Sequence, residues 1–208
     1  ELCIELSQNS YLRRLFGLPY VNIGNDPKLD DDQSVSAEYI QAKLEEYQLY
    51  RDMSDVELVL RFFALRNIDG YAKRTFHDFL DAYLSLANEF ERKILADLSA
   101  LFENTIKFAF DLLGDNAFKL VRRRKLQSGD SWSWYNRPTT TVYDPLMQAL
   151  SQFLEKKNAL LDKTDDIRRD IELFYQKNYD AFEGRNNNKN NIEDRYNLYK
   201  EFLSSYLE

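Results

Sequence analysis

The chain has one histidine and one cysteine among its 208 residues. A zinc site needs several such side chains around the metal, so His77 and Cys3 cannot form one within this chain. The same scarcity excludes an HNH-type nuclease centre, which uses more than one histidine. A lone cysteine also cannot form an internal disulfide, which favours a reducing, cytoplasmic location.

Glycine and proline are scarce as well, with 6 Gly and 4 Pro in the whole chain. So few helix breakers predict long helices. None of the glycines stands in a G-x-x-x-x-G-K-[ST] or G-x-G-x-x-G loop, so both common phosphate cradles are missing. No apolar run approaches the roughly 20 residues of a membrane-spanning helix, and the first residues do not form a signal peptide. We therefore expect no contact with a membrane.

The net charge is −7, which argues against a protein that coats nucleic acid with its whole surface. A local basic patch remains compatible with this charge. Hydrophobic residues make up 44% and charged residues 30%, the balance of a globular domain. The 14 Phe and 14 Tyr supply enough rings to fill the space between long helices.

We predict an all-α fold, a bundle of about seven to nine helices around one long central helix, in a single domain over residues 1–208. The central helix is expected over residues 88–113, because apolar residues recur there at alternating spacings of three and four. They are Phe90, Ile94, Leu98, Leu101, Thr105, Phe108 and Leu112. Since the chain begins inside an apparent helix, we expect it to be the C-terminal part of a larger protein.

Polar residues at fixed offsets predict where other helices begin. Ser54 starts a capping box at the head of a helix that extends to about residue 66. Thr75 and Asp78 open the next helix in the same way. Asp144 as cap and Pro145 at the first helical position predict a further helix. A helix is also expected over residues 36–51.

Residues 115–142 break the helical pattern and predict an irregular basic and aromatic loop, with at most a short extended piece at 118–121. The candidate nucleic-acid-binding residues lie here: Lys119, Arg122, Arg123, Arg124, Lys125, Trp132, Trp134 and Arg137. Basic side chains neutralise phosphates, and exposed rings stack on bases. The alternative is a solvated loop whose tryptophans fold back onto the helices.

A second candidate group lies around the helix that begins near Ser54, which is apolar on nearly every side. Its members are Arg51, Asp55, Glu57 and Arg61. Glu57 and Arg61 are spaced i,i+4, and burying charges is costly unless they are paired. We expect this pair to be partly or fully buried and hydrogen-bonded, as a structural cluster. The alternative is an interdomain role, in which these residues contact another domain or its nucleotide.

Among the remaining titratable residues, the sequence indicates no metal site and no catalytic residue. Asp26 and the run Asp30–Asp32 lack the alternating ligands and the turn glycine of a calcium loop, so we interpret them as a solvated acidic loop. The aspartates between 162 and 170 lie at a helix start, where negative charge favours the helix dipole. His77 lies opposite the apolar stripe of its helix and is expected to face solvent.

The stretch Arg51–Leu65, RDMSDVELVLRFFAL, resembles the helical part of the GmrSD-type restriction endonuclease family. In that bacterial family an R-x-x-D-x-E-x-x-L-R-F-like stretch follows a ParB-like N-terminal domain. Residues 5–16 are similar to the preceding helix of the family, and Phe79–Tyr83 to its F-L-N-x-Y helix. The resemblance covers roughly residues 1–115, and residues 19–50 form an insertion relative to the family.

This resemblance implies a parent protein that hydrolyses nucleotides, with magnesium, and cuts foreign DNA in antiphage defence. The chemistry of the family lies in a D-G-x-x-R-type motif upstream of this segment, so the resemblance places no catalytic residue and no cofactor here. The implied partners are the upstream ParB-like domain and DNA. The alternative function is a helical protein–protein interaction module that binds no nucleic acid. Binding that weakens steeply with added salt would indicate contact with DNA phosphates, whereas an apolar protein interface would show little salt dependence.

Overall fold

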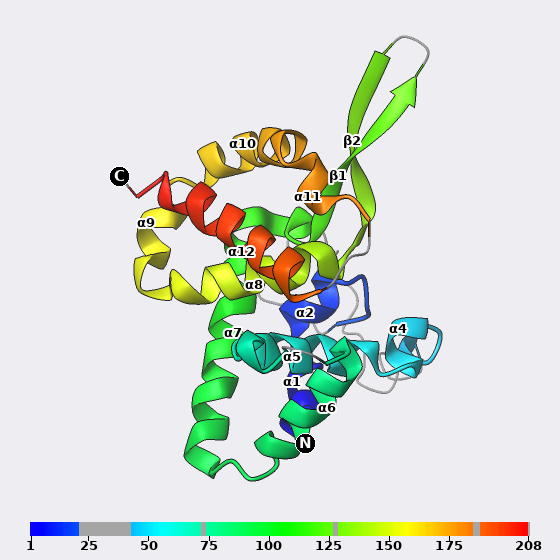
Figure 1. The fold of residues 1–208 in the computed structure, drawn as a ribbon, viewed down its shortest axis with the longest axis vertical. Helices are drawn as coiled ribbons and strands as arrows, with labels where there is room; N and C mark the ends of the chain where they lie inside the picture. Colours follow the sequence, from blue (N-terminus) through cyan, green and yellow to red (C-terminus); the bar gives the residue numbers. More distant parts are fainter. Residues whose placement is uncertain (21–42, 72–73, 127–128, 185–187, 208) are drawn as a thin grey trace, which may run out of the picture.

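The computed structural model describes residues 1–20, 43–71, 74–126, 129–184 and 188–207. The protein is mostly helical, which confirms the predicted fold class, and it also contains a two-stranded hairpin (Figure 1).

The first helices are α1 (Leu2–Leu6), α2 (Ser10–Leu15), α4 (Gln48–Arg51), α5 (Ser54–Leu65), α6 (Phe76–Ala87) and α7 (Arg92–Leu113). The hairpin consists of β1 (Lys119–Leu126) and β2 (Gly129–Pro138). The later helices are α8 (Thr140–Gln152), α9 (Lys157–Leu161), α10 (Thr164–Lys177), α11 (Tyr179–Phe182) and α12 (Lys189–Ser204). Short 3-10 turns cover Ile68–Tyr71, Gly114–Asn116 and Leu154–Lys156.

The predicted central helix is α7, which is 22 residues long. It begins at Arg92 rather than at residue 88, because Glu91 is extended and the chain turns back there from α6. Its C-terminal half lies in the core, whereas its first turns project from the body (Figure 1). The helix ends at Gly114, whose positive φ of 60° suits glycine.

Helix α8 is the most completely buried element, with every residue from 141 to 150 inside the protein. It contacts α5, α7 and α12. The prediction that this helix begins at Asp144 and Pro145 is wrong. Thr139 caps it instead, accepting a hydrogen bond from the Thr141 amide at 3.2 Å. Because α8 starts one turn early, Asp144 lies inside the helix and points into the core.

The two predicted capping motifs have different outcomes. Thr75 caps α6 as expected, with its hydroxyl accepting from the Asp78 amide at 3.1 Å and donating to the Asp78 carboxylate at 2.7 Å. Ser54 does not cap α5, since it is already the first helical residue. The cap position is taken by Met53, in the left-handed region at φ 53°, and no side-chain cap bond forms.

The expected helix over 36–51 lies only partly within the described residues. Residues 21–42, including the acidic run at 30–32 and most of the 19–50 insertion, lie outside the described residues. In the part that follows, Tyr47 is extended, so α4 forms only from Gln48 to Arg51.

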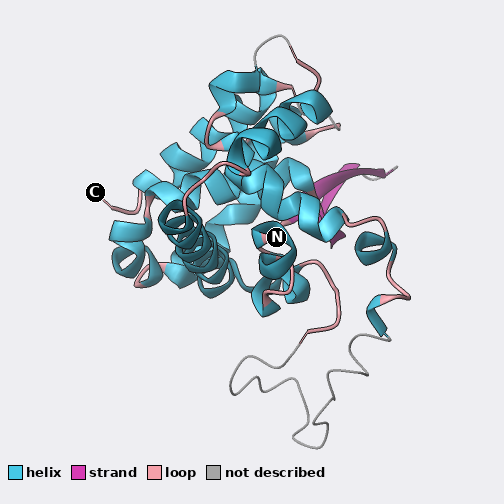
Figure 2. Ribbon diagram, turned by 90° about the horizontal axis from the view of Figure 1, so that it is seen from below, coloured by secondary structure: helices cyan, strands magenta, loops and turns pink. Residues whose placement is uncertain are grey.

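The prediction of an irregular loop over residues 115–142 is also wrong. Strands β1 and β2 pair antiparallel, with Val121 opposite Trp134 and Arg123 opposite Trp132. Figure 2 shows the helices gathered in one body with the hairpin at its margin, and the far end of the hairpin extends beyond them. On β2, serine and tryptophan alternate from Ser131 to Trp134, a period of two that suits a strand, whereas β1 has four basic residues in a row after Val121.

Candidate functional site

The hairpin has an inner face toward the helices and an outer face toward solvent. The register places Val121, Arg123, Trp132 and Trp134 on the inner face. Arg122, Arg124, Ser131, Ser133 and Tyr135 form the outer face, because side chains alternate along a strand. The basic run is therefore divided between two surfaces with different environments.

Both tryptophans lie against the helical body. The Trp132 ring packs edge-on against Tyr179 with the ring centres 5.4 Å apart. The Trp134 ring packs on Tyr175 at 6.0 Å, and its indole N–H donates to the Glu172 carboxylate. The prediction that these rings stack on bases is therefore not supported, and the alternative, that they fold back onto the helices, describes what the structure shows.

Arg123 shares this inner environment. Its guanidinium lies over the Tyr179 ring, 5.2 Å from the ring centre. Lys119, at the base of the hairpin, donates to the Asn116 side chain at 3.3 Å. The side chain of Lys125 lies outside those described. Lys119 and Arg123 thus contact neighbouring side chains, although Arg123 is itself exposed.

The outer face carries two exposed arginines of the basic run. Arg122 and Arg124 are exposed and stand opposite Ser133 and Ser131 on the neighbouring strand. The Arg122 guanidinium lies over the Tyr135 ring at 3.5 Å from its centre, a cation–π contact that holds it in an extended position. Among the described side chains, neither arginine has an ion-pair partner.

Arg137 is also exposed, near the end of β2. The register is irregular there, since Val121 lies opposite Trp134 but Lys119 lies opposite Pro138, so Arg137 is not assigned to either face. The described outer face thus presents two guanidinium groups and three hydroxyl groups, all of them hydrogen-bond donors, with no carboxylate between them. Tyr135 supplies the aromatic ring on this face.

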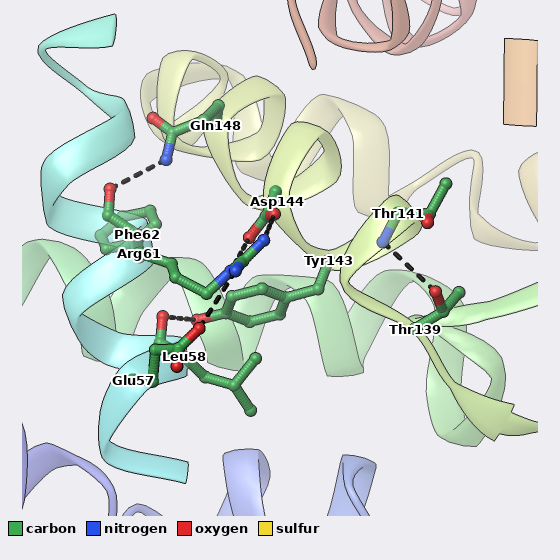
Figure 3. A network of polar contacts seen from close by, with 9 residues as sticks. All are labelled: Glu57, Leu58, Arg61, Phe62, Thr139, Thr141, Tyr143, Asp144 and Gln148. Carbon is green, nitrogen blue, oxygen red and sulfur yellow. Dashed lines mark hydrogen bonds and ion pairs between the residues drawn. The ribbon is translucent and has the colours of Figure 1, made fainter. Parts of the chain in front are cut away.

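The second candidate group is organised around Arg61, which is buried (Figure 3). Its guanidinium forms a two-pronged ion pair with Asp144 of α8, with Nε donating to Oδ1 at 3.0 Å and the second prong from Nη2 to Oδ2. Asp144 is 1% exposed. The Arg61 Nη1 also donates to Glu57 at 3.1 Å, and the Phe76 ring lies 4.3 Å from the guanidinium carbon.

The prediction about this pair is confirmed for Arg61; Glu57 forms the predicted hydrogen bond with it, but its side chain is 51% exposed. Glu57 is exposed, so the neutralising charge in the core comes from Asp144, 83 residues further along the chain. Burial raises the pKa of Asp144, and the Arg61 guanidinium opposes that effect. Burial also disfavours the charged form of Arg61, but the Asp144 carboxylate outweighs it and holds the pKa of Arg61 above its usual value.

Neighbouring residues of α8 bind the carbonyl groups of α5. The Tyr143 hydroxyl donates to the Leu58 carbonyl at 2.9 Å, and the Gln148 amide donates to the Phe62 carbonyl at 2.9 Å (Figure 3). Together with the Arg61–Asp144 pair, these bonds join two helices far apart in sequence. The arrangement is closed and fully paired, which supports the structural interpretation of Arg61.

Arg51 and Asp55 do not join this group. Arg51 is exposed and donates to the Glu45 carbonyl at 2.9 Å. Asp55 is buried at the start of α5, where its Oδ1 accepts from the Val56 amide at 2.9 Å. No hydrogen bond or ion pair among the described residues connects either of them to Arg61. The four predicted residues therefore belong to separate environments.

A cleft of about 600 Å³ lies between α5, α8 and α12. Its lining mixes the cation Arg66 with the carboxylates Glu193 and Asp194 and with the side-chain amides of Gln148 and Asn197. Lys189 and Asp69 form an ion pair at 2.6 Å between α12 and the 3-10 turn beside α5. The mixed signs of charge do not favour a phosphate group here.

The described residues contain no cluster of three or more His, Cys, Asp or Glu side chains that is suitable for a metal ion. His77 is exposed, 3.5 Å from Asp81. At the start of α10, Arg169 pairs with Asp166 at 2.8 Å and with Asp170 at 3.0 Å. Within the part of the chain that is described, no helix has the length and apolarity needed to cross a membrane.

Comparison with known proteins finds no family model, no curated protein and no solved structure that matches the chain.

Proposed function

We propose that this chain is a helical accessory module that contacts DNA through the outer face of the β1–β2 hairpin. The observation that carries the proposal is the row of exposed arginines on one face of a projecting hairpin, in a protein whose net charge is −7. A positive arm on an acidic body orients the molecule toward a polyanion, because the body is repelled while the arm is attracted.

The geometry suits a nucleic-acid backbone. A two-stranded β-ribbon fits the major groove of duplex DNA, and arginine and serine side chains are common donors to phosphate oxygens. Arg122 and Arg124 supply the charge on this face, with Ser133 and Ser131 opposite them on the neighbouring strand, and Arg137 is exposed further along β2. Contacts of this kind position a protein on DNA without selecting a sequence.

Such a module fits the role that the family resemblance implies. The chain would support an upstream ParB-like domain and help hold DNA for a nucleotide-dependent restriction activity that resides elsewhere in the parent protein. Nucleotide and magnesium would be bound by that other part. The exposed arginines of the hairpin support DNA contact independently of the resemblance.

The test is charge reversal on the outer face. Arg122→Glu with Arg124→Glu is compared with Arg92→Glu with Lys93→Glu, which reverses two exposed charges at the start of α7. Binding of a labelled DNA duplex is measured by fluorescence anisotropy between about 50 and 200 mM salt. The hairpin variant should lose most of the affinity, and its salt slope should fall by about 1.8, roughly 0.9 per lost phosphate contact. Equal binding by the wild type and the hairpin variant would refute the proposal.

A protein-interaction module is the second candidate, favoured by one observation. Leu84, Leu86 and Ile94 are 42%, 60% and 43% exposed around the turn between α6 and α7. Apolar side chains gathered at one end of a protein are typical of a docking surface. A partner bound there would be insensitive to salt, in contrast to phosphate contacts on the hairpin.

A further inference from the structure

A pocket of about 330 Å³ lies where α1 and α2 meet the start of α5. Arg13 and Asp55 line it, and both are buried, at 8% and 1% exposure. The rim includes Ile4 and Met53, which are apolar yet 49% and 54% exposed. The pocket therefore combines a buried polar floor with an exposed aliphatic edge.

Each charged side chain of the floor has an unsatisfied polar atom. The Nε of Arg13 donates no hydrogen bond, and the Oδ2 of Asp55 accepts none. Buried polar atoms are nearly always hydrogen-bonded, and each exception calls for an explanation, such as a missing ligand group. Here two exceptions, one donor and one acceptor, lie in the same pocket.

The Arg13 guanidinium and the Asp55 carboxylate interact electrostatically but do not form an ion pair. Burial lowers the pKa of Arg13 and raises that of Asp55, and each charge partly offsets the effect on the other. The described residues nevertheless hold no Arg13–Asp55 ion pair, in contrast to the two-pronged contact of Arg61 with Asp144. A guanidinium and a carboxylate held apart leave space for a group between them.

The chemistry of that group follows from the two free atoms. It must accept from the Arg13 Nε–H and donate to the Asp55 Oδ2. A free anion would satisfy the arginine and be repelled by the aspartate, and a cation would do the reverse. A carboxamide does both, because its C=O accepts and its N–H donates.

We propose that this pocket binds a peptide group of a partner polypeptide, with an aliphatic side chain of the partner against Ile4 and Met53. The Met53 backbone supports the assignment. A methionine in the left-handed region is uncommon, and this conformation places its side chain on the pocket rim. A protein partner accounts for the orphan polar atoms and the exposed aliphatic edge together.

The experiment observes the Arg13 Nε–H signal directly in a 15N-labelled protein, assigned by its loss in Arg13→Lys. The probe is N-acetylleucinamide, which carries two amide groups and one aliphatic side chain. The Arg13 signal should shift in a saturable way, with a dissociation constant on the order of a few millimolar, as expected for a small ligand of ordinary efficiency. Absence of a saturable shift overturns the proposal and leaves the cavity as a water site.

Two comparisons separate the other outcomes. Acetate and guanidinium are titrated in parallel, and an equal response to either one overturns the carboxamide assignment in favour of a simple ion site. Met53→Gly removes the rim side chain at a position whose positive φ favours glycine, so folding is preserved. This substitution should lower the affinity for N-acetylleucinamide about fivefold and leave the affinity for acetamide unchanged. Equal affinity for N-acetylleucinamide in the wild type and the variant would show that the Met53 side chain takes no part in binding. The hairpin is not involved, so these results do not depend on DNA binding.

Discussion

Arg61 and Arg122 carry the same guanidinium group in two opposite settings. In the helical body, Arg61 is buried, and Asp144 and Glu57 satisfy it from two directions. On the hairpin, Arg122 is exposed and lies on the Tyr135 ring, with no carboxylate paired to it among the described side chains. A charge that is fully neutralised contributes to the fold, whereas a charge left at the surface remains available for a ligand.

The aromatic residues show the same division. Rings of α10, α11 and α12 form a continuous buried group around Phe174 and Tyr199. The hairpin adds only Trp132 and Trp134 at the margin of that group. The β1–β2 hairpin thus packs against the helices along one face. The substitutions below test how far the stability of the hairpin depends on that of the helices.

Asp144→Ala should give the largest effect, because it leaves Arg61 buried without its main partner. We expect a loss of roughly 3–5 kcal/mol in the free energy of unfolding, measured by chemical denaturation. Glu57→Ala, which removes the exposed partner, should cost about 0.5 kcal/mol or less. Equal losses in the two variants would show that the core does not depend on the Arg61–Asp144 pair.

A double replacement sharpens this result. Arg61→Met with Asp144→Leu removes both charges and keeps apolar volume, so it should be clearly less destabilising than Asp144→Ala. If the double variant is instead the less stable of the two, then the hydrogen bonds of the pair outweigh its desolvation cost.

Trp134→Ala should destabilise the β1–β2 hairpin more than the helical part of the protein. The indole loses its contact with Tyr175 and its hydrogen bond to Glu172, which together should cost about 1–3 kcal/mol locally. Hydrogen exchange of the β1 and β2 amides should therefore accelerate well before that of α7. Tyr135→Ala, on the outer face, is the matched control. A uniform acceleration over the whole chain would mean that arm and body unfold as one unit.

Arg168→Met tests the contact between α7 and α10, the helix against which the hairpin packs. Arg168 on α10 donates to the Leu112 carbonyl at 2.8 Å and to the Asp111 carbonyl at 2.9 Å, where α7 ends. Loss of these bonds should cost about 1 kcal/mol. Arg169→Met, which removes only exposed ion pairs, should have a smaller effect on the thermal midpoint, and the reverse order would contradict this role.

Asp69→Asn should have the smallest effect, and it should depend on pH. The hydrogen bond from Lys189 lowers the pKa of Asp69 below its ordinary value. A lowered folded-state pKa gives a stabilisation that is present above the unfolded pKa of about 3.9 and is lost as pH falls through the folded value. The difference between wild type and variant should therefore be detectable near neutral pH and vanish in acid and in high salt. Asp97→Asn, at an exposed site on α7, is the control for the loss of one surface carboxylate.

The helices were predictable where local pattern and local capping agree. The apolar stripe of α6 and its Thr75 cap lie within a few residues of one another, so no distant contact is needed to specify them. The apolar seam of α7 likewise predicts a long helix, although the turn at Glu91 that shortens it was not foreseen. The basic and aromatic candidates were found from composition, but which of them reach solvent was not.

The sequence by itself determined the helical class, the long α7 and the exclusion of Cys–His zinc sites, because these depend on periodicity and on residue counts. Only the tertiary structure decided that residues 119–138 pair as a hairpin, which divides Arg122 from Arg123 onto opposite faces. It also chose Asp144 as the partner of Arg61 and left Arg13 and Asp55 unpaired. Pairing and burial join residues far apart in the chain, and no local pattern encodes which distant groups will meet.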